Sequence, residues 1–208
     1  MGRFKTTSER LSNMTLVFAT NNENKVKEIR AVLGDSFSII TLQEAGIDID
    51  IPEPHDTLEA NATEKSVTIN KMTGKNCFSE DTGLEIPALH GAPGVLSARY
   101  AGEQKLADDN ITKVLHELQG NEDRKANFRT IISLILEGKE YQFEGICSGT
   151  ILKERKGGKG FGYDPIFVPD GTNKTFAEMD LTEKSQYSHR AKAFHKLVNF
   201  LKKNHING

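Results

Sequence analysis

The chain has 208 residues, a formal net charge of −2 at pH 7 and 37% hydrophobic residues. This length allows one sizeable domain that buries roughly 70% of its unfolded surface without help from disulfides or a structural metal. The small net charge argues against a broad nucleic-acid-binding face, and no apolar run approaches the roughly 20 residues of a membrane span. Cys77 and Cys147 form no CxxC or Cys/His cluster, which is typical of a reduced, cytoplasmic protein.

Apolar residues recur with the periods of strands and helices along the chain, which predicts an α/β domain. Residues 1–13 are polar and basic, so we expect a disordered N-terminal extension, or a remnant foreign to the native chain, before a single domain at 14–208. In chain order, we expect a strand at 16–19, a helix through 26–33, a strand at 37–42, a helix at 57–72, a strand at 77–81 with extended structure at 84–86, a helix at 109–118, strands at 128–137, 141–146, 149–152 and 166–168, and a helix at 189–203.

Polar residues follow the first expected strand and lead into the first expected helix, in the segment Thr20-Asn21-Asn22-Glu23-Asn24-Lys25. Free backbone N–H groups and the helix dipole attract anions at such a turn, and Lys25 adds a positive charge. The structural alternative is a capped helix start with a solvated lysine. The segment is not a P-loop, because GxxxxGK[ST] is absent.

Two neighbouring carboxylates, Glu80 and Asp81, stand where an apolar strand is expected to meet a turn. Adjacent carboxylates repel each other, and a cation near them resolves the repulsion. Oxygen ligands without a histidine or cysteine cluster favour magnesium over zinc. Glu53 lies between two prolines in segment 51–56, which cannot be regular structure, and could supply another oxygen. An exposed acidic turn is the structural alternative.

The loop Lys159-Gly160-Phe161-Gly162-Tyr163-Asp164-Pro165 combines two glycines, two aromatic faces and a carboxylate. Glycine lets the backbone turn tightly or approach a ligand, and an aromatic face can stack on a flat ring. This combination suits a planar heterocycle that carries charge.

Ser188-His189-Arg190 begins the last expected helix, with Ser188 as its N-cap. The helix dipole disfavours positive charge in the first turn by about 0.3–1 kcal/mol per group. An anion or a carbonyl-bearing base nearby would compensate for His189 and Arg190, and Lys184 lies just upstream. The alternative is a capped helix in which both side chains are exposed.

Together these segments resemble the inosine triphosphate pyrophosphatase family, from Thr15 to about Leu201. The resemblance also includes Gly91-Ala92-Pro93-Gly94-Val95 and Ser97-Ala98-Arg99-Tyr100, in the family's order. It implies a mixed α/β fold with a long central sheet flanked by helices, two lobes around a cleft, and a homodimer. The implied reaction is Mg²⁺-dependent hydrolysis of noncanonical purine nucleoside triphosphates (ITP, dITP, XTP) to the monophosphate and diphosphate, which cleanses the nucleotide pool.

The resemblance also implies roles for particular residues. Asp81 would be the general base and a metal ligand, with Glu53 and Glu80 as further candidate ligands. The substrate would be held by Thr20, Asn21, Asn22, Glu23, Asn24, Lys25, Thr82, Phe161, Gly162, Tyr163, Asp164, Lys184, His189 and Arg190. The family's more usual Asp-Asp-Ser-Gly reads Glu80-Asp81-Thr82-Gly83 here, so direct metal ligation by Glu80 stays open.

The sequence leaves two alternative functions open. One is a pyrophosphatase for other modified or canonical nucleoside triphosphates, and the other is a nucleotide sensor without turnover. Nucleic-acid binding and membrane association are not expected.

Overall fold

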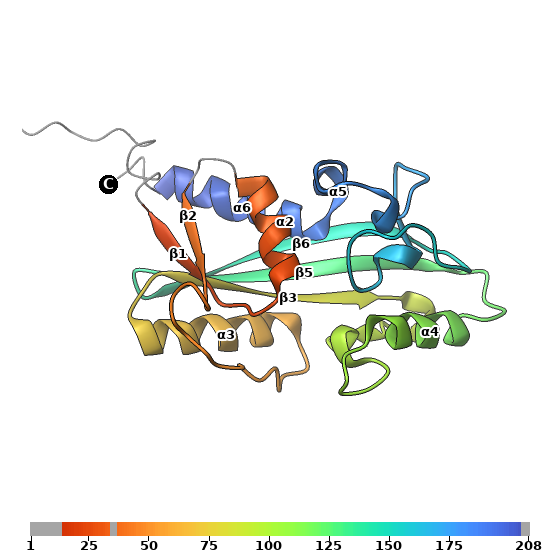
Figure 1. The fold of residues 1–208 in the computed structure, drawn as a ribbon, viewed down its shortest axis with the longest axis horizontal. Coiled ribbons are helices and arrows are strands. Elements are labelled where there is room, and N and C mark those ends of the chain that lie inside the picture. Colours follow the sequence, from red (N-terminus) through yellow and green to blue (C-terminus); the bar gives the residue numbers. More distant parts are fainter. Residues whose placement is uncertain (1–13, 34–36, 205–208) are drawn as a thin grey trace, which may run out of the picture.

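The computed structural model describes residues 14–33 and 37–204 (Figure 1). The extension predicted at 1–13 lies outside the described residues, and a single domain at 14–208 stays a prediction.

Within the described residues, a seven-stranded mixed sheet organises the fold, with the order β2-β1-β3-β5-β6-β7 and β4 paired to β3. The β1, β2 and β3 strands run parallel, whereas the pairs from β3 through β7 are antiparallel. The strands are β1 (Thr15–Phe18), β2 (Ser38–Thr41), β3 (Cys77–Glu85), β4 (Pro93–Gly94), β5 (Lys125–Leu136), β6 (Lys139–Ile151) and β7 (Phe167–Pro169).

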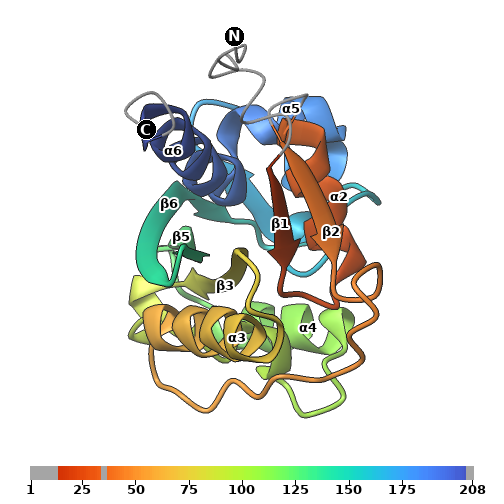
Figure 2. The same cartoon turned by 90° about the vertical axis from the view of Figure 1, so that its left-hand side faces the viewer.

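Helices cover both faces of this sheet (Figures 1 and 2). One face carries α3 (Leu58–Thr73) and α4 (Ala107–Glu117). The other face carries α2 (Glu23–Leu33), α5 (Leu181–Tyr187) and α6 (His189–Asn204). Short 3-10 turns are η1 (Pro87–Leu89), η2 (Ser97–Arg99), η3 (Asp164–Ile166) and η4 (Phe176–Glu178). The expected α/β fold with an elongated mixed sheet is therefore confirmed.

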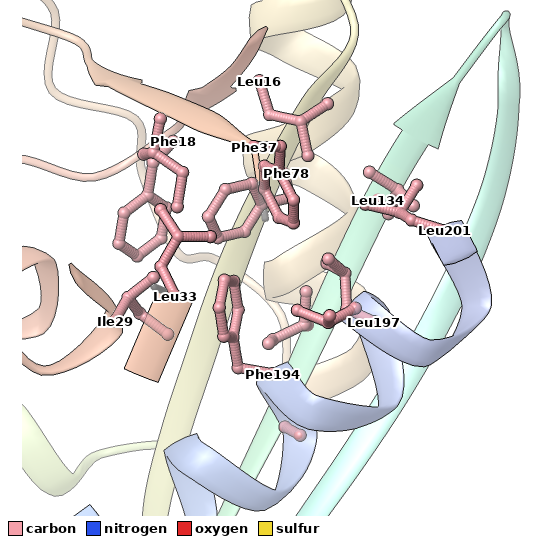
Figure 3. Packing of buried hydrophobic residues seen from close by; sticks show 14 of the residues in the cluster. Leu16, Phe18, Ile29, Leu33, Phe37, Phe78, Leu134, Phe194, Leu197 and Leu201 are labelled. Atoms are coloured by element: carbon pink, nitrogen blue, oxygen red, sulfur yellow. The ribbon is translucent and has the colours of Figure 1, made fainter. Parts of the chain in front are cut away.

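The largest apolar cluster joins α2, α6 and the sheet (Figure 3). The rings of Phe18 and Phe78 stack with centroids 4.4 Å apart, and the ring of Phe194 lies 6.1 Å from that of Phe78. All three are fully buried, which contributes roughly 1.5–3 kcal/mol per side chain. This cluster positions α2, β3 and α6 relative to one another, and the polar site described below uses all three.

Several predicted elements are corrected by the structure. The strand predicted at 77–81 continues to Glu85, so Glu80 and Asp81 lie within a strand and not at a turn. The strands predicted at 141–146 and 149–152 form one strand, β6. A Cβ on Gly145 would lie 2.0 Å from the carbonyl oxygen of His189, and one on Gly149 would lie 2.3 Å from that of Val168. These glycines therefore permit close approach by α6 and β7 and do not end a strand. Helix α5 was not predicted.

Candidate functional site

A cavity opens where β1 ends beside β3. β1 pairs with β3 only opposite residues 77 and 78, and β4 pairs with it only at 84 and 85. Between these pairings, residues 79–83 of β3 have no strand partner on that side among the described residues. The cavity has a volume of about 640 Å³, which suits a ligand of nucleotide size. The turn after β1 lines this cavity at the carboxyl end of a parallel strand, which is where α/β folds commonly bind ligands.

Most of the predicted site residues line this cavity. They are Thr20, Asn21, Asn22, Lys25, Glu53, Asp81, Thr82, Phe161, Gly162, Tyr163, Asp164, Lys184, His189 and Arg190. Glu23, Asn24 and Glu80 do not line it. The cavity thus brings together segments that are up to 170 positions apart in the sequence.

The turn from Thr20 to Lys25 is organised by the side chain of Asn22. Its Oδ1 accepts hydrogen bonds from the N–H groups of Asn24 (3.0 Å) and Lys25 (3.3 Å), as an N-cap does. Asn21 Nδ2 donates to the carbonyl oxygen of Ile49 (2.8 Å), which ties the turn to the segment that carries Glu53. Asn22 therefore already occupies two of the N–H groups that were expected to bind an anion. For this reason, anion binding at this turn depends more on the positive charge of Lys25.

Asp81 and Glu53 converge on one cationic group that was not predicted, the ammonium of Lys65 on α3. Lys65 Nζ lies 2.6 Å from Glu53 Oε1 and 3.1 Å from Asp81 Oδ1. Burial raises the pKa of Asp81, and the opposing attraction of Lys65 does not cancel this increase. Burial acts in the same direction on Glu53, but Lys65 outweighs it and lowers the pKa of Glu53 below its ordinary value. Asp81 is thus the carboxylate of this pair that more readily accepts a proton.

Glu80 faces the opposite way from Asp81, because successive side chains of a strand alternate between its two faces. It is paired with cations from α2 and α6. Its Oε1 lies 3.0 Å from Lys25 Nζ, and its Oε2 accepts a hydrogen bond of 2.7 Å from Arg190 Nε. The two neighbouring carboxylates therefore avoid repulsion by using separate cations on separate faces of the sheet.

A chain of alternating buried charges continues from Arg190. Arg190 Nη1 also donates to Glu28, whose other oxygen lies 2.6 Å from Lys184 Nζ. Lys184 Nζ in turn donates to Asp164 Oδ2 at 2.5 Å. These contacts supply the compensation that the sequence led us to expect for Arg190, from carboxylates of the protein itself. In order, the members of this ion chain are Lys25, Glu80, Arg190, Glu28, Lys184 and Asp164.

Burial raises the pKa of both Glu28 and Asp164, but the net shifts of these two carboxylates have opposite directions. For Glu28, Arg190 and Lys184 outweigh burial and leave the pKa below its ordinary value. For Asp164, which touches only one cation, burial prevails and the pKa is raised despite Lys184. A carboxylate between two cations is therefore the more firmly ionised.

Aromatic rings gather at the other end of the cavity. The ring centroid of Phe161 lies 5.1 Å from Lys184 Nζ and 5.5 Å from Arg190 Cζ. His189 stacks on Phe128, with ring centroids 4.6 Å apart and planes inclined by 12°. The hydroxyl of Tyr163 donates to the carbonyl oxygen of Ser97 (2.8 Å), so Tyr163 joins two walls of the cavity. This end offers flat apolar surfaces beside positive charge.

Lys65 and Glu28 were both missed by sequence reasoning. A signal for Lys65 existed, because it shares the buried face of α3 with Leu58, Ala62 and Ile69 at helical spacing. A lysine on such a face is rarely buried without a charged partner. No comparable signal pointed to Glu28, since its partners Lys184 and Arg190 lie 156 and 162 positions further along the chain.

No helix in 14–33 and 37–204 combines the length and the apolar character needed to cross a membrane. No cluster of three or more His, Cys, Asp or Glu side chains in these ranges is arranged to hold a metal ion.

The buried His189 leads to a prediction about pH and stability. Burial, together with Arg190 and Lys184, lowers the pKa of His189 well below its ordinary value, so it stays neutral when folded. The unfolded chain takes up a proton near pH 6.5 and the folded chain does not. His189 therefore allows full stability above about pH 6.5 and costs stability as the pH falls below it, by up to about 1.4 kcal/mol per pH unit.

We expect His189→Gln to reduce this slope of the free energy of unfolding between pH 7 and 5, as measured by urea denaturation. His195→Gln is the matched control, because His195 is exposed on the same helix. An equal slope in the native protein and in His189→Gln would contradict the prediction.

Comparison with known proteins agrees with this fold. The model of the Ham1 family matches residues 16–200, so the chain belongs to the Ham1 family. It is 50% identical over 188 residues to a dITP/XTP pyrophosphatase of Flavobacterium johnsoniae, covering 90% of this chain and 98% of that protein. A dITP/XTP pyrophosphatase of Porphyromonas gingivalis is also 50% identical, over 187 residues that cover 89% of this chain and 96% of that protein.

Solved structures give the same result. The Ham1 protein of Staphylococcus aureus superposes with a TM-score of 0.83 at 38% identity, covering 92% of this chain and 100% of the other. A HAM1 protein of Coxiella burnetii also reaches 0.83, at 36% identity and with 91% and 99% covered. The family resemblance inferred from the sequence is thereby confirmed.

Proposed function

We propose that this protein hydrolyses noncanonical purine nucleoside triphosphates, namely dITP, ITP and XTP, to the monophosphate and diphosphate. The observation that carries the proposal is one cavity that brings together a cationic turn, the carboxylate pair of Glu53 and Asp81, and an aromatic, cationic end. The names of the relatives, dITP/XTP pyrophosphatases, support this choice of substrate. We further propose that it acts as a homodimer in the cytoplasm.

The carboxylate pair fits a magnesium ion. Asp81 and Glu53 already direct one oxygen each to a single cation, Lys65 Nζ, at 3.1 and 2.6 Å. Mg²⁺ is commonly bound through one or two carboxylates, with phosphate oxygens and water completing its ligands. Bound by these two residues, it would neutralise charge on the phosphate oxygens.

The side chains of the cavity divide the reaction between them. Asp81 orients a water molecule and accepts its proton as the water attacks the α-phosphorus, a role suited to its raised pKa. Lys25, whose side chain is 16% exposed, stabilises the departing diphosphate. The hydroxyl groups of Thr20 and Thr82 and the backbone N–H of Asn21 donate to the phosphates, with Asn22, Glu23 and Asn24 shaping the turn.

The opposite end selects the base. Hypoxanthine and xanthine carry an acceptor oxygen at position 6, where adenine carries a donor amino group. Neutral His189 lines the cavity, and its buried Nδ1 has no hydrogen-bond partner in the described structure, so its imidazole can bind a purine edge. Phe161 stacks on the purine ring, and Gly162 allows the loop to turn. The walls of the cavity at this end are formed by Tyr163, Asp164, Lys184 and Arg190. A donor facing the adenine amino group would reject ATP by up to about 10⁴–10⁵-fold.

The test is diphosphate release from ITP, XTP, GTP, ATP and dTTP, each with Mg²⁺ and with EDTA. We expect metal-dependent release of diphosphate that is largely confined to ITP and XTP. Orthophosphate release, or equal rates on ATP and ITP, would contradict the proposal. Tight binding of ITP without turnover would favour the sensor instead.

A further inference from the structure

We propose that Glu80 is a positioning residue that couples the phosphate end of the cavity to its base end, and that it does not ligate magnesium. This proposal deepens the proposed function and rests on it. It concerns the one predicted metal ligand that the structure separates from the others.

The position of Glu80 does not suit a metal ligand. Its side chain is fully buried, it does not line the cavity, and its two oxygens contact two different cations. Mg²⁺ gives up its water molecules reluctantly and usually keeps several of them when a protein binds it. Glu53 and Asp81, by contrast, both line the cavity and share one cation.

Glu80 instead connects two cavity residues that have different tasks. Lys25 lines the cavity beside the turn after β1, and Arg190 lines it beside Phe161. One oxygen of Glu80 lies 3.0 Å from Lys25 Nζ and the other lies 2.7 Å from Arg190 Nε. A shift of Lys25 toward a phosphate weakens its hold on Glu80, which then binds Arg190 more strongly. Phosphate binding thus fixes Arg190 for the base, and by linkage the base favours phosphate binding equally.

The length of the side chain matters for this bridge. Aspartate is shorter than glutamate by one carbon–carbon bond, about 1.5 Å. An aspartate at position 80 would therefore keep the charge but could not hold both cations at the present distances. Glu80→Asp shortens the side chain but keeps its charge, so it tests the bridge between the two cations more directly than removal of the carboxylate does.

The experiment measures binding of inosine and of inorganic diphosphate, separately and together, by isothermal titration calorimetry in EDTA, so that no turnover occurs. In the native protein we expect diphosphate to raise the affinity for inosine by at least about 5-fold, within the usual range of coupling between sites. In Glu80→Asp and Glu80→Gln we expect this factor to fall close to one, while each ligand alone still binds. Glu85→Gln, a carboxylate of the same strand outside the cavity, is the control and should keep the native factor. Far-UV circular dichroism verifies folding, and Glu80→Asp preserves the charge balance if Glu80→Gln does not fold.

A second measurement tests the metal part of the proposal with Mn²⁺ binding, followed by electron paramagnetic resonance. We expect Glu80→Asp to bind Mn²⁺ as the native protein does, and Asp81→Asn to bind it at least about tenfold more weakly. An equal loss of Mn²⁺ affinity in both variants would overturn the proposal. The proposal would also be overturned if diphosphate raised the inosine affinity of Glu80→Asp by the native factor. Inosine binding without coupling in the native protein would overturn this inference alone. No inosine binding would overturn the proposed function as well.

Discussion

Replacing Asp81 by asparagine is expected to lower kcat/KM for ITP by roughly 10²–10⁴-fold, the usual contribution of a general base. An asparagine has almost the same shape and can still accept a hydrogen bond from Lys65, which lies 3.1 Å from Asp81 Oδ1. It cannot take the proton of an attacking water, and it binds a divalent cation poorly. The chemistry is therefore lost while the packing around β3 is kept.

The measurement is diphosphate release at saturating and at limiting ITP, together with thermal unfolding of each variant. Glu85→Gln serves as the control, because it removes a carboxylate from the same strand without touching the cavity. We expect near-native rates from Glu85→Gln. Near-full turnover in a folded Asp81→Asn protein would show that another group activates the water.

Local motifs in the sequence predicted most of the residues that line the cavity but not how their charges pair. The turn after β1, the loop with Phe161 and the start of α6 were each recognisable from neighbouring residues. Pairing depends on which face of the sheet a side chain occupies. The sequence predicted Glu80 and Asp81 at a turn, where one cation near both carboxylates would resolve their repulsion. Their position within β3 places them on opposite faces, and each carboxylate meets its own cations.

The missed features share a physical cause. Glu28 becomes part of the site only when α2 packs beside α5 and α6, an arrangement set by the apolar cluster around Phe194. The glycines of β6 carry no local sign that α6 will approach closely at Gly145. Such information is tertiary, so periodicity and turn signals along one chain do not contain it.

Removing the guanidinium of Arg190 is expected to be among the most destabilising single changes in the site. Arg190 is 2% exposed and binds both Glu28 and Glu80, which are also buried. Breaking a buried pair by removing one partner typically costs about 3–5 kcal/mol, because a buried charge is left uncompensated. Here Lys184 still neutralises Glu28 and Lys25 still neutralises Glu80, so we expect Arg190→Met to cost about 3 kcal/mol.

Urea denaturation at pH 7 measures this cost, and a chain of this size should lose about 2–4 °C in Tm for each kcal/mol. Arg30→Met is the matched control, because Arg30 pairs with Glu44 and both side chains are nearly half exposed. Exposed pairs contribute about 0–1 kcal/mol, so that variant should stay close to the native stability. The double variant Glu28→Gln, Arg190→Met removes one carboxylate together with the cation, which leaves Lys25 paired with Glu80 and Lys184 paired with Asp164. It should regain part of the lost stability, because no buried carboxylate is then left in excess. If the double variant is less stable than Arg190→Met, the single variant loses stability through packing and not through unpaired charge.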